Sequence, residues 1–251
     1  MKLLRDTWLI FQRQMVLMLR NPIWVIMGII QPVYYLLLFG PLLKPALNAP
    51  TSAEAYRFFV PGVLIMLTIF VTSFVGFGLL AELRAGVIER SRVTPVSRVA
   101  LLLGRSLRDV VGLLGQCAII TVLAIPFGLS TGLGDVLLAF LLLALIALML
   151  SAASYGAALK LHSEDAIGAL VNFVSQPVVL LSGILLPMAF GPGWLRGVAT
   201  WNPLYWAVEA ARALFAGDPG RASVWKALLI LSVLTTASVT WSARAFARSV
   251  R

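Results

Sequence analysis

The chain has 251 residues, of which 60% are hydrophobic and only 12% are charged. A soluble domain of this size could not keep so much apolar surface from water, so the composition excludes an ordinary soluble protein. Twenty Lys and Arg residues stand against ten Asp and Glu residues. Because the basic residues flank long apolar windows, we interpret them as orientation and lipid-headgroup signals and expect no nucleic-acid partner.

An amphipathic helix is predicted for residues 1–21. At about 100° per residue its charged side chains share one arc, and its apolar side chains fill the opposite side. This pattern is typical of a helix in the plane of the membrane interface, with Trp8 as an anchor. Asn21 and Pro22 end this helix and begin the next element.

Six apolar windows follow, each near the roughly 20 residues that cross a bilayer. The predicted fold class is therefore an all-α integral membrane protein with six transmembrane helices. No room remains for a separate soluble domain, so residues 1–251 form a single transmembrane domain. The predicted spans are 22–43, 58–81, 110–129, 136–159, 166–189 and 223–243.

Residues 190–220, between spans five and six, combine apolar stretches with four charged residues and the helix breakers Pro192 and Pro203. Charges and prolines argue against a simple lipid-exposed span. We predict two short helices that dip into the outer leaflet and return, with tryptophans as interfacial anchors. The residues assigned to this re-entrant hairpin are Trp194, Trp201, Asn202, Pro203, Glu209 and Arg212.

Lys and Arg counting predicts the orientation of the chain. With the N-terminus inside, the inner segments hold fourteen of these residues and the outer segments hold six. The positive-inside rule then places both termini in the cytoplasm. We expect a multi-pass protein of the cytoplasmic membrane in contact with its lipids.

The sequence carries no enzyme motif that we recognise. A paired-His zinc motif, a G-x-S-x-G elbow and a Cys–His pair at useful spacing are all absent. No Gly precedes any of the four lysines, so the GxxxxGK[ST] phosphate loop is absent too. We expect a chain that is not an enzyme and binds no cofactor or metal itself.

Asp109, near the start of span three, is the only acidic candidate for a group inside a span. It follows Arg105 by one turn, and we expect an ion pair between the two at the interface. The other five spans have no ionisable group near their centres. Proton- or sodium-coupled carriers need such groups, so coupling energy must come from elsewhere.

Polar and aromatic side chains within the predicted spans are candidates to line a translocation path. The alternative is that the polar ones hold helices together, at about 0.6–2 kcal/mol each. The candidate path residues are Phe70, Thr72, Phe74, Asn172, Ser175 and Gln176.

The most charged stretch, residues 82–109, carries the strongest motif. An acidic residue, a Gly and a Glu precede Thr94-Pro95, and Leu103-Gly104-Arg105 follows. This order resembles the first cytoplasmic loop of ABC type-2 transporter permeases. A second region, from Leu181-Ser-Gly through Trp201-Asn-Pro to Glu209-Ala-Ala-Arg, is similar to the outer hairpin of daunorubicin-resistance-type drug-export permeases.

The resemblance implies a partner and a coupling loop. Such permeases form dimers, and each copy docks a separate ABC ATPase subunit that binds ATP and Mg on the cytoplasmic side. An ordinary basic inner loop is the alternative for this segment. The residues that would contact the ATPase are Glu89, Arg90, Arg92, Thr94, Pro95, Ser97 and Arg98.

The resemblance further implies the permease subunit of an ATP-driven exporter of hydrophobic or amphiphilic, drug- or antibiotic-like compounds, built as a homodimer. Export of a lipid-linked glycan or lipo-oligosaccharide by the same machine is one alternative. An integral membrane enzyme or assembly factor is another, but it would need catalytic groups clustered at one membrane face.

Overall fold

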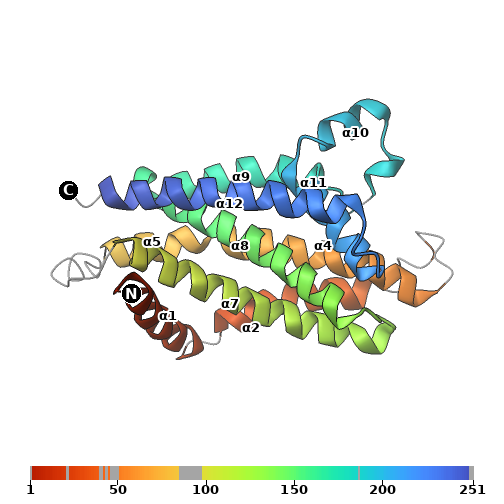
Figure 1. Cartoon of the computed structure of the whole chain (residues 1–251), viewed down its shortest axis with the longest axis horizontal. Helices are drawn as coiled ribbons and strands as arrows, with labels where there is room; N and C mark the ends of the chain where they lie inside the picture. Colours follow the sequence, from red (N-terminus) through yellow and green to blue (C-terminus); the bar gives the residue numbers. More distant parts are fainter. Residues whose placement is uncertain are drawn as a thin grey trace.

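The computed structural model describes residues 2–20, 23–39, 42, 45, 51–84, 98–185 and 187–248, which form a bundle of helices (Figure 1). No β-strand occurs in these ranges. Within them, four helical segments are long and apolar enough to cross a membrane: Ser52–Arg84, Val99–Phe127, Leu133–Leu161 and Ala222–Phe246. The prediction of an all-helical membrane protein is confirmed, whereas the count of six spans stays a prediction.

The first and fifth predicted spans correspond to shorter helices. Helix α2 (Ile23–Tyr34) contains Pro32 and continues into the π-helical segment η1 (Tyr35–Phe39). Helix α9 (Glu164–Leu180) ends three residues after Pro177. Because proline has no N–H and crowds the preceding turn, it weakens a helix at this point. Of the rest of the predicted fifth span, residues 181–185 form turns and bends, and residues 188 and 189 belong to the short η3 (Met188–Phe190).

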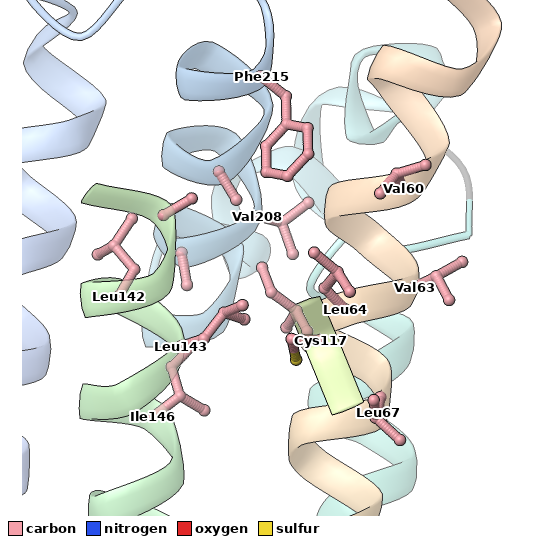
Figure 2. Close-up of a cluster of buried hydrophobic side chains, with 14 of the residues drawn as sticks. Val60, Val63, Leu64, Leu67, Cys117, Leu142, Leu143, Ile146, Val208 and Phe215 are labelled. Atoms are coloured by element: carbon pink, nitrogen blue, oxygen red, sulfur yellow. The ribbon is translucent and has the colours of Figure 1, made fainter. Parts of the chain in front are cut away.

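Helix α8 (Leu133–Leu161) lies at the centre of the bundle and packs against α12 (Ala222–Arg248) along much of its length. Small residues permit this contact, since a Cβ on Gly156 would lie 2.2 Å from the Trp241 ring. On its other side α8 meets α4, α7 and α11, whose apolar side chains converge in one buried core (Figure 2).

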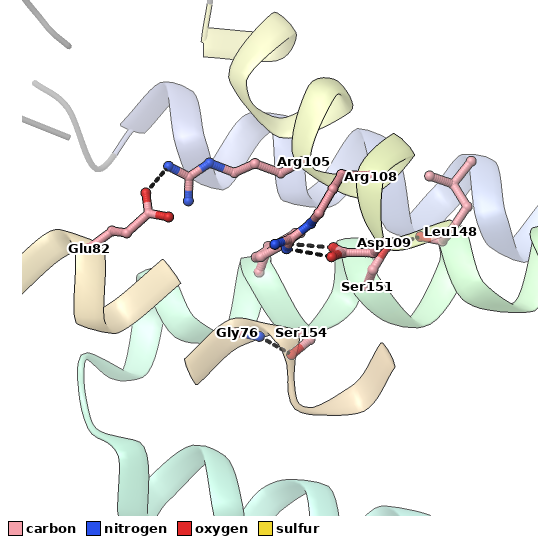
Figure 3. Close-up of polar contacts among 9 residues, drawn as sticks. Gly76, Glu82, Arg105, Arg108, Asp109, Leu148, Ser151 and Ser154 are labelled. Atoms are coloured by element: carbon pink, nitrogen blue, oxygen red, sulfur yellow. Dashed lines mark hydrogen bonds and ion pairs between the residues drawn. The ribbon is translucent and has the colours of Figure 1, made fainter. Parts of the chain in front are cut away.

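The second predicted span is two helices in line, α4 (Ser52–Ser73) and α5 (Val75–Arg84), interrupted at Phe74. Ser154 of α8 bridges the interruption (Figure 3). Its Oγ donates to the Ser73 carbonyl at 2.6 Å and accepts from the Gly76 N–H at 2.9 Å. Lipid offers no hydrogen bonds, so a neighbouring helix must supply them where a span is broken.

Helix α7 (Arg98–Ala124) begins well before the predicted third span, so residues 98–109 are helical rather than loop. Helix α1 (Lys2–Arg20) packs on this early part of α7. The contact is close at Gly104, where a Cβ would lie 2.7 Å from Ile10 and 2.9 Å from the Thr7 carbonyl oxygen. This docking stabilises a helix where the charges of the segment had indicated a loop.

Residues 187–220 hold two further helices, α10 (Gly193–Ala199) and α11 (Pro203–Phe215). Helix α10 protrudes from one end of the bundle, whereas α11 is buried against α4, α8 and α12 (Figure 1). The two helices are present, but their dip into a leaflet stays a prediction. The first residues of α1 and the last residues of α12 lie toward the opposite end of the bundle (Figure 1).

Candidate functional site

A cavity of about 850 Å³ lies between α1, α2, η1, α4, α5 and α7. Its wall is mostly apolar and includes three partly exposed aromatic rings of α4 and α5, those of Phe70, Phe74 and Phe77. Phe74 sits at the interruption between the two helices, and its ring centroid lies 5.4 Å from that of Phe77. The broken span thus contributes an aromatic face to the cavity.

The polar part of the cavity wall is built on ion pairs (Figure 3). Arg108 and Asp109 of α7 pair at 2.5 Å, and the Tyr155 hydroxyl of α8 donates to the second oxygen of Asp109 at 2.5 Å. Glu82 of α5 pairs with Arg105 of α7. Glu82, Arg108 and Asp109 line the cavity.

The ion pair that we predicted between Arg105 and Asp109 is therefore wrong. Spacing along one helix suggested it, but Arg105 pairs with a residue of another helix and Asp109 pairs with its neighbour Arg108. Glu82 reaches Arg105 from α5, and Tyr155 reaches Asp109 from α8. Asp109 is buried, as expected for a carboxylate whose two oxygens both have partners.

Two of the six candidate path residues, Phe70 and Phe74, line the cavity. Thr72 does not, because its buried hydroxyl donates to the Thr68 carbonyl at 2.6 Å within the same helix. Asn172, Ser175 and Gln176 lie on α9, outside the residues that line the cavity.

Helix α9 buries only Ile167 and leaves much of its surface open. Asn172 and Gln176 are exposed there, beside Phe173, whose side chain is 80% exposed. The structure therefore places two of the predicted path residues in the cavity wall, three on α9 and one, Thr72, in the buried face of α4.

Sequence reasoning missed the part of α1 in this site. Gln14, Leu17 and Met18 line the cavity, and Gln14 is buried. The signal in the sequence was the amide side chain of Gln14, at a position of α1 that faces the neighbouring helix. Only the packing of α1 on α7 places this side chain in the wall of the cavity.

The predicted hairpin residues form a second polar centre around Arg212. Its guanidinium donates to the carbonyls of Phe58, Gly183 and Ile184 at 3.3, 2.8 and 3.2 Å. It also lies 3.7 Å from the centroid of the Phe58 ring, and 3.7 Å from the Glu209 carboxylate. Arg212 thus ties α11 to α4 and to the segment that follows α9.

Asn202 joins α11 to the end of α9. Its side-chain oxygen accepts from the Leu204 N–H at 3.0 Å, which caps α11, and Pro203 takes the first helical position. Its amide group donates to the Val178 carbonyl at 2.7 Å, one of the carbonyls left without a partner where α9 ends. Trp194 and Trp201 are exposed, as interfacial anchors would be.

Six of the predicted coupling residues lie outside the described residues: Glu89, Arg90, Arg92, Thr94, Pro95 and Ser97. The seventh, Arg98, is the first residue of α7. Ion pairs fix the helices on both sides of this segment. Glu82 pairs with Arg105, and Arg84 at the end of α5 pairs with Glu164 at the start of α9 at 2.7 Å.

Residues 5–216 match the family model of the ABC-2 type transporter. The chain belongs to the ABC-2 type transporter family. It is 27% identical over 214 residues to the daunorubicin resistance ABC transporter permease protein of Streptomyces coeruleorubidus, covering 84% of this chain and 74% of that protein. The predicted resemblance is confirmed, and the chain is a multi-pass membrane permease of the ABC-2 type.

Other relatives carry related names. The chain is 26% identical to a putative transport permease of Cyanophora paradoxa over 222 residues, which are 85% of this chain and 75% of that protein. It is 24% identical to a probable doxorubicin resistance ABC transporter permease protein of Mycobacterium tuberculosis, with 80% and 73% covered.

Proposed function

We propose that this ABC-2 permease is the membrane-spanning subunit of an exporter that moves hydrophobic or amphiphilic compounds with ATP hydrolysed by a separate ABC ATPase subunit. The observation that carries the proposal is the family match over residues 5–216. Relatives named for daunorubicin and doxorubicin resistance support the substrate class.

The cavity supports the same proposal from physical chemistry. Its volume of about 850 Å³ is within the roughly 300–1,000 Å³ of small-molecule sites, and its wall is mostly apolar and aromatic. A compound that partitions into lipid would find there a mostly apolar surface, together with polar groups to orient it.

The proposed machine has a defined arrangement in the cell membrane. Both termini face the cytoplasm, six segments cross the bilayer, α1 lies in the inner interface, and residues 190–220 dip into the outer leaflet. Residues 89–98 dock the ATPase, so the ion-paired ends of α5 and α7 receive its movement. Two copies of the chain associate, and the open face of α9 with Asn172, Ser175 and Gln176 borders the path between them.

Co-expression with the ABC ATPases of the same cell tests the proposal. We expect the two chains to co-purify and to hydrolyse ATP together, while the permease alone shows no hydrolysis above a preparation from cells that lack the ATPase. Hydrolysis by the isolated permease, or no association with any ABC ATPase of the same cell, would contradict the proposal.

A further inference from the structure

We propose that α4 and α5 together are a two-state element of the transport cycle. They are interrupted at Phe74 while the Ser154 hydroxyl bridges the break, and they form one continuous helix when that bridge is released. Ser154 is then the positioning residue that sets the balance between the two states. This inference rests on the proposed export function and deepens it by locating a moving part within one copy of the chain.

The interruption is held by a side chain of another helix. Phe74 has φ −98° and ψ 0°, so the regular helix stops there, and the Phe77 N–H turns back to the Phe74 carbonyl at 3.1 Å. The Ser154 Oγ joins the two loose ends, the Ser73 carbonyl and the Gly76 N–H, at 2.6 and 2.9 Å (Figure 3). The bridge therefore stabilises the interrupted state.

The residues at the break can also form an unbroken helix. Residues 72–80 include no proline, so each of them has an N–H for the helical ladder. In a continuous helix the Gly76 N–H would bond to the Thr72 carbonyl, and the Phe77 N–H to the Ser73 carbonyl. The serine hydroxyl that is released can bond to a carbonyl of its own helix. Each of these groups thus has a partner in both states, as two states of similar free energy require.

Gly76 lets α5 lie directly against α8. A Cβ at this position would lie 2.7 Å from both the carbonyl oxygen and the Oγ of Ser154. Helix α5 packs chiefly on α8, and the glycine removes the side chain that would obstruct a rotation of α5 at this contact.

The far end of α5 is the place where movement of the ATPase would enter. The proposed docking segment, residues 89–98, lies between α5 and α7 in the chain. Glu82 of α5 pairs with Arg105 of α7, and Arg84 of α5 pairs with Glu164 of α9 at 2.7 Å. Movement of these elements therefore acts on α5, and the break is the first point at which α4 need not follow.

A change at the break alters the cavity directly. The cavity is lined by residues of both α4 and α5, and those of α5 are Val75, Phe77, Gly78 and Glu82. A helix turns by about 100° per residue, so closing the break rotates α5 about its own axis relative to α4. This rotation changes which side chains of α5 face the cavity.

Hydrogen–deuterium exchange of the peptide that covers residues 73–80 tests the inference on the purified full chain in lipid nanodiscs, without ATPase. Ser154→Ala removes the bridge. A two-state element then shifts toward the continuous helix, whose amides bond within the helix, so the exchange rate of this peptide should fall at least about threefold. A static break would instead lose the partner of the Gly76 N–H, and exchange would become faster.

Ser151→Ala is the matched control. Ser151 lies about one turn before Ser154 on α8 and is equally buried, but its hydroxyl donates to the Leu148 carbonyl of the same helix at 3.3 Å (Figure 3). This variant should exchange as the original chain does. Exchange in Ser154→Ala that is faster or unchanged, or that slows equally in both variants, would overturn the proposal.

The coupling of transport to ATP hydrolysis gives a second readout. Proteoliposomes that contain the chain and its ABC ATPase report ATP hydrolysis and rhodamine 6G accumulation from one preparation. Ser154→Ala should hydrolyse ATP within about twofold of Ser151→Ala but accumulate at least about fivefold less dye per ATP, because the continuous span no longer switches. A serine that only supports the fold would lower both activities together, and that result would overturn the inference.

The two measurements separate this inference from the proposed function. Slower exchange in Ser154→Ala, without ATP-driven accumulation by the original chain, would refute the proposed function alone. Accumulation by the original chain, together with faster exchange in Ser154→Ala, would refute this inference alone.

Discussion

Replacing Arg212 by alanine should destabilise the protein more than any other single charge removal in residues 190–220. The guanidinium satisfies three carbonyls, those of Phe58, Gly183 and Ile184, and stacks on the Phe58 ring. The Arg212 residue is only 9% exposed. Alanine would take this donor from the carbonyls of Gly183 and Ile184, which lie outside any helix, in a region where α11, α4 and the end of α9 meet.

The size of the effect follows from those contacts. Each buried carbonyl left unsatisfied costs about 1–3 kcal/mol, and removing one member of a buried charged group costs about 3–5 kcal/mol in total. For a chain of this length, 1 kcal/mol shifts the melting temperature by about 2–4 °C. We therefore expect Arg212→Ala to melt about 6–20 °C below the original protein. Arg212→Lys should fall between the two, since one ammonium cannot reach three carbonyls in the plane of a guanidinium.

Thermal denaturation of the detergent-purified chain, followed by the loss of the monodisperse peak in size-exclusion chromatography, measures this shift. Arg196→Ala is the matched control, because Arg196 is an exposed arginine on the neighbouring α10. An exposed substitution of this kind should stay within about 0.5 kcal/mol of the original. Equal melting temperatures for Arg212→Ala and Arg196→Ala would refute the reasoning that Arg212 ties these segments together.

Three further predictions follow from the fold and the sequence. Gly156→Leu should reduce the yield of folded protein sharply, because even a Cβ would lie 2.2 Å from the Trp241 ring. The control Gly197→Leu on α10, where nothing lies within 4 Å, should fold normally. Equal yields of the two variants would refute the close contact between α8 and α12. Reporter fusions after Arg248 should be active only in the cytoplasm, and activity outside the cell would overturn the proposed topology. Replacing Thr94 and Pro95 by alanine should leave membrane insertion normal but reduce co-purification of the ATPase more than about thirtyfold. This reduction corresponds to the loss of an interface contact of about 2–5 kcal/mol. Full co-purification would indicate that the segment is an ordinary basic loop.

The sequence was sufficient for properties that depend on local pattern. Apolar windows and their basic flanks predict a helical membrane protein, and the motif from Glu82 to Arg105 predicts the ABC-2 family. The start of α9 is also local, because Ser163 caps it by accepting from the Ala166 N–H.

Features that depend on contacts distant in sequence were not predicted. The interruption at Phe74 depends on Ser154, a serine in another helix that fills the gap between Ser73 and Gly76. Nothing in residues 73–76 alone requires a break. The early start of α7 is similar, since Arg105 pairs with Glu82 of α5 and Asp109 accepts from Tyr155 of α8, partners that no local pattern could identify.

The candidate site was predicted in part for the same reason. Phe70 and Phe74 could be selected from composition alone, as aromatic residues in the second span. Gln14 could not, because its place in the cavity wall depends on how α1 docks against α7 at Gly104. A cavity formed by several helices is defined only when their rotations about their own axes are known.

The central claim is that the chain exports amphiphilic compounds with energy from ATP rather than from an ion gradient. Proteoliposomes that contain the chain and its ABC ATPase test it directly, with a panel of fluorescent amphiphiles that includes rhodamine 6G. With ATP at the ATPase side and an uncoupler present, we expect accumulation that stops when a catalytically inactive ATPase is substituted. Accumulation driven by an imposed proton gradient without ATP, and lost when that gradient is collapsed in the presence of ATP, would contradict the account.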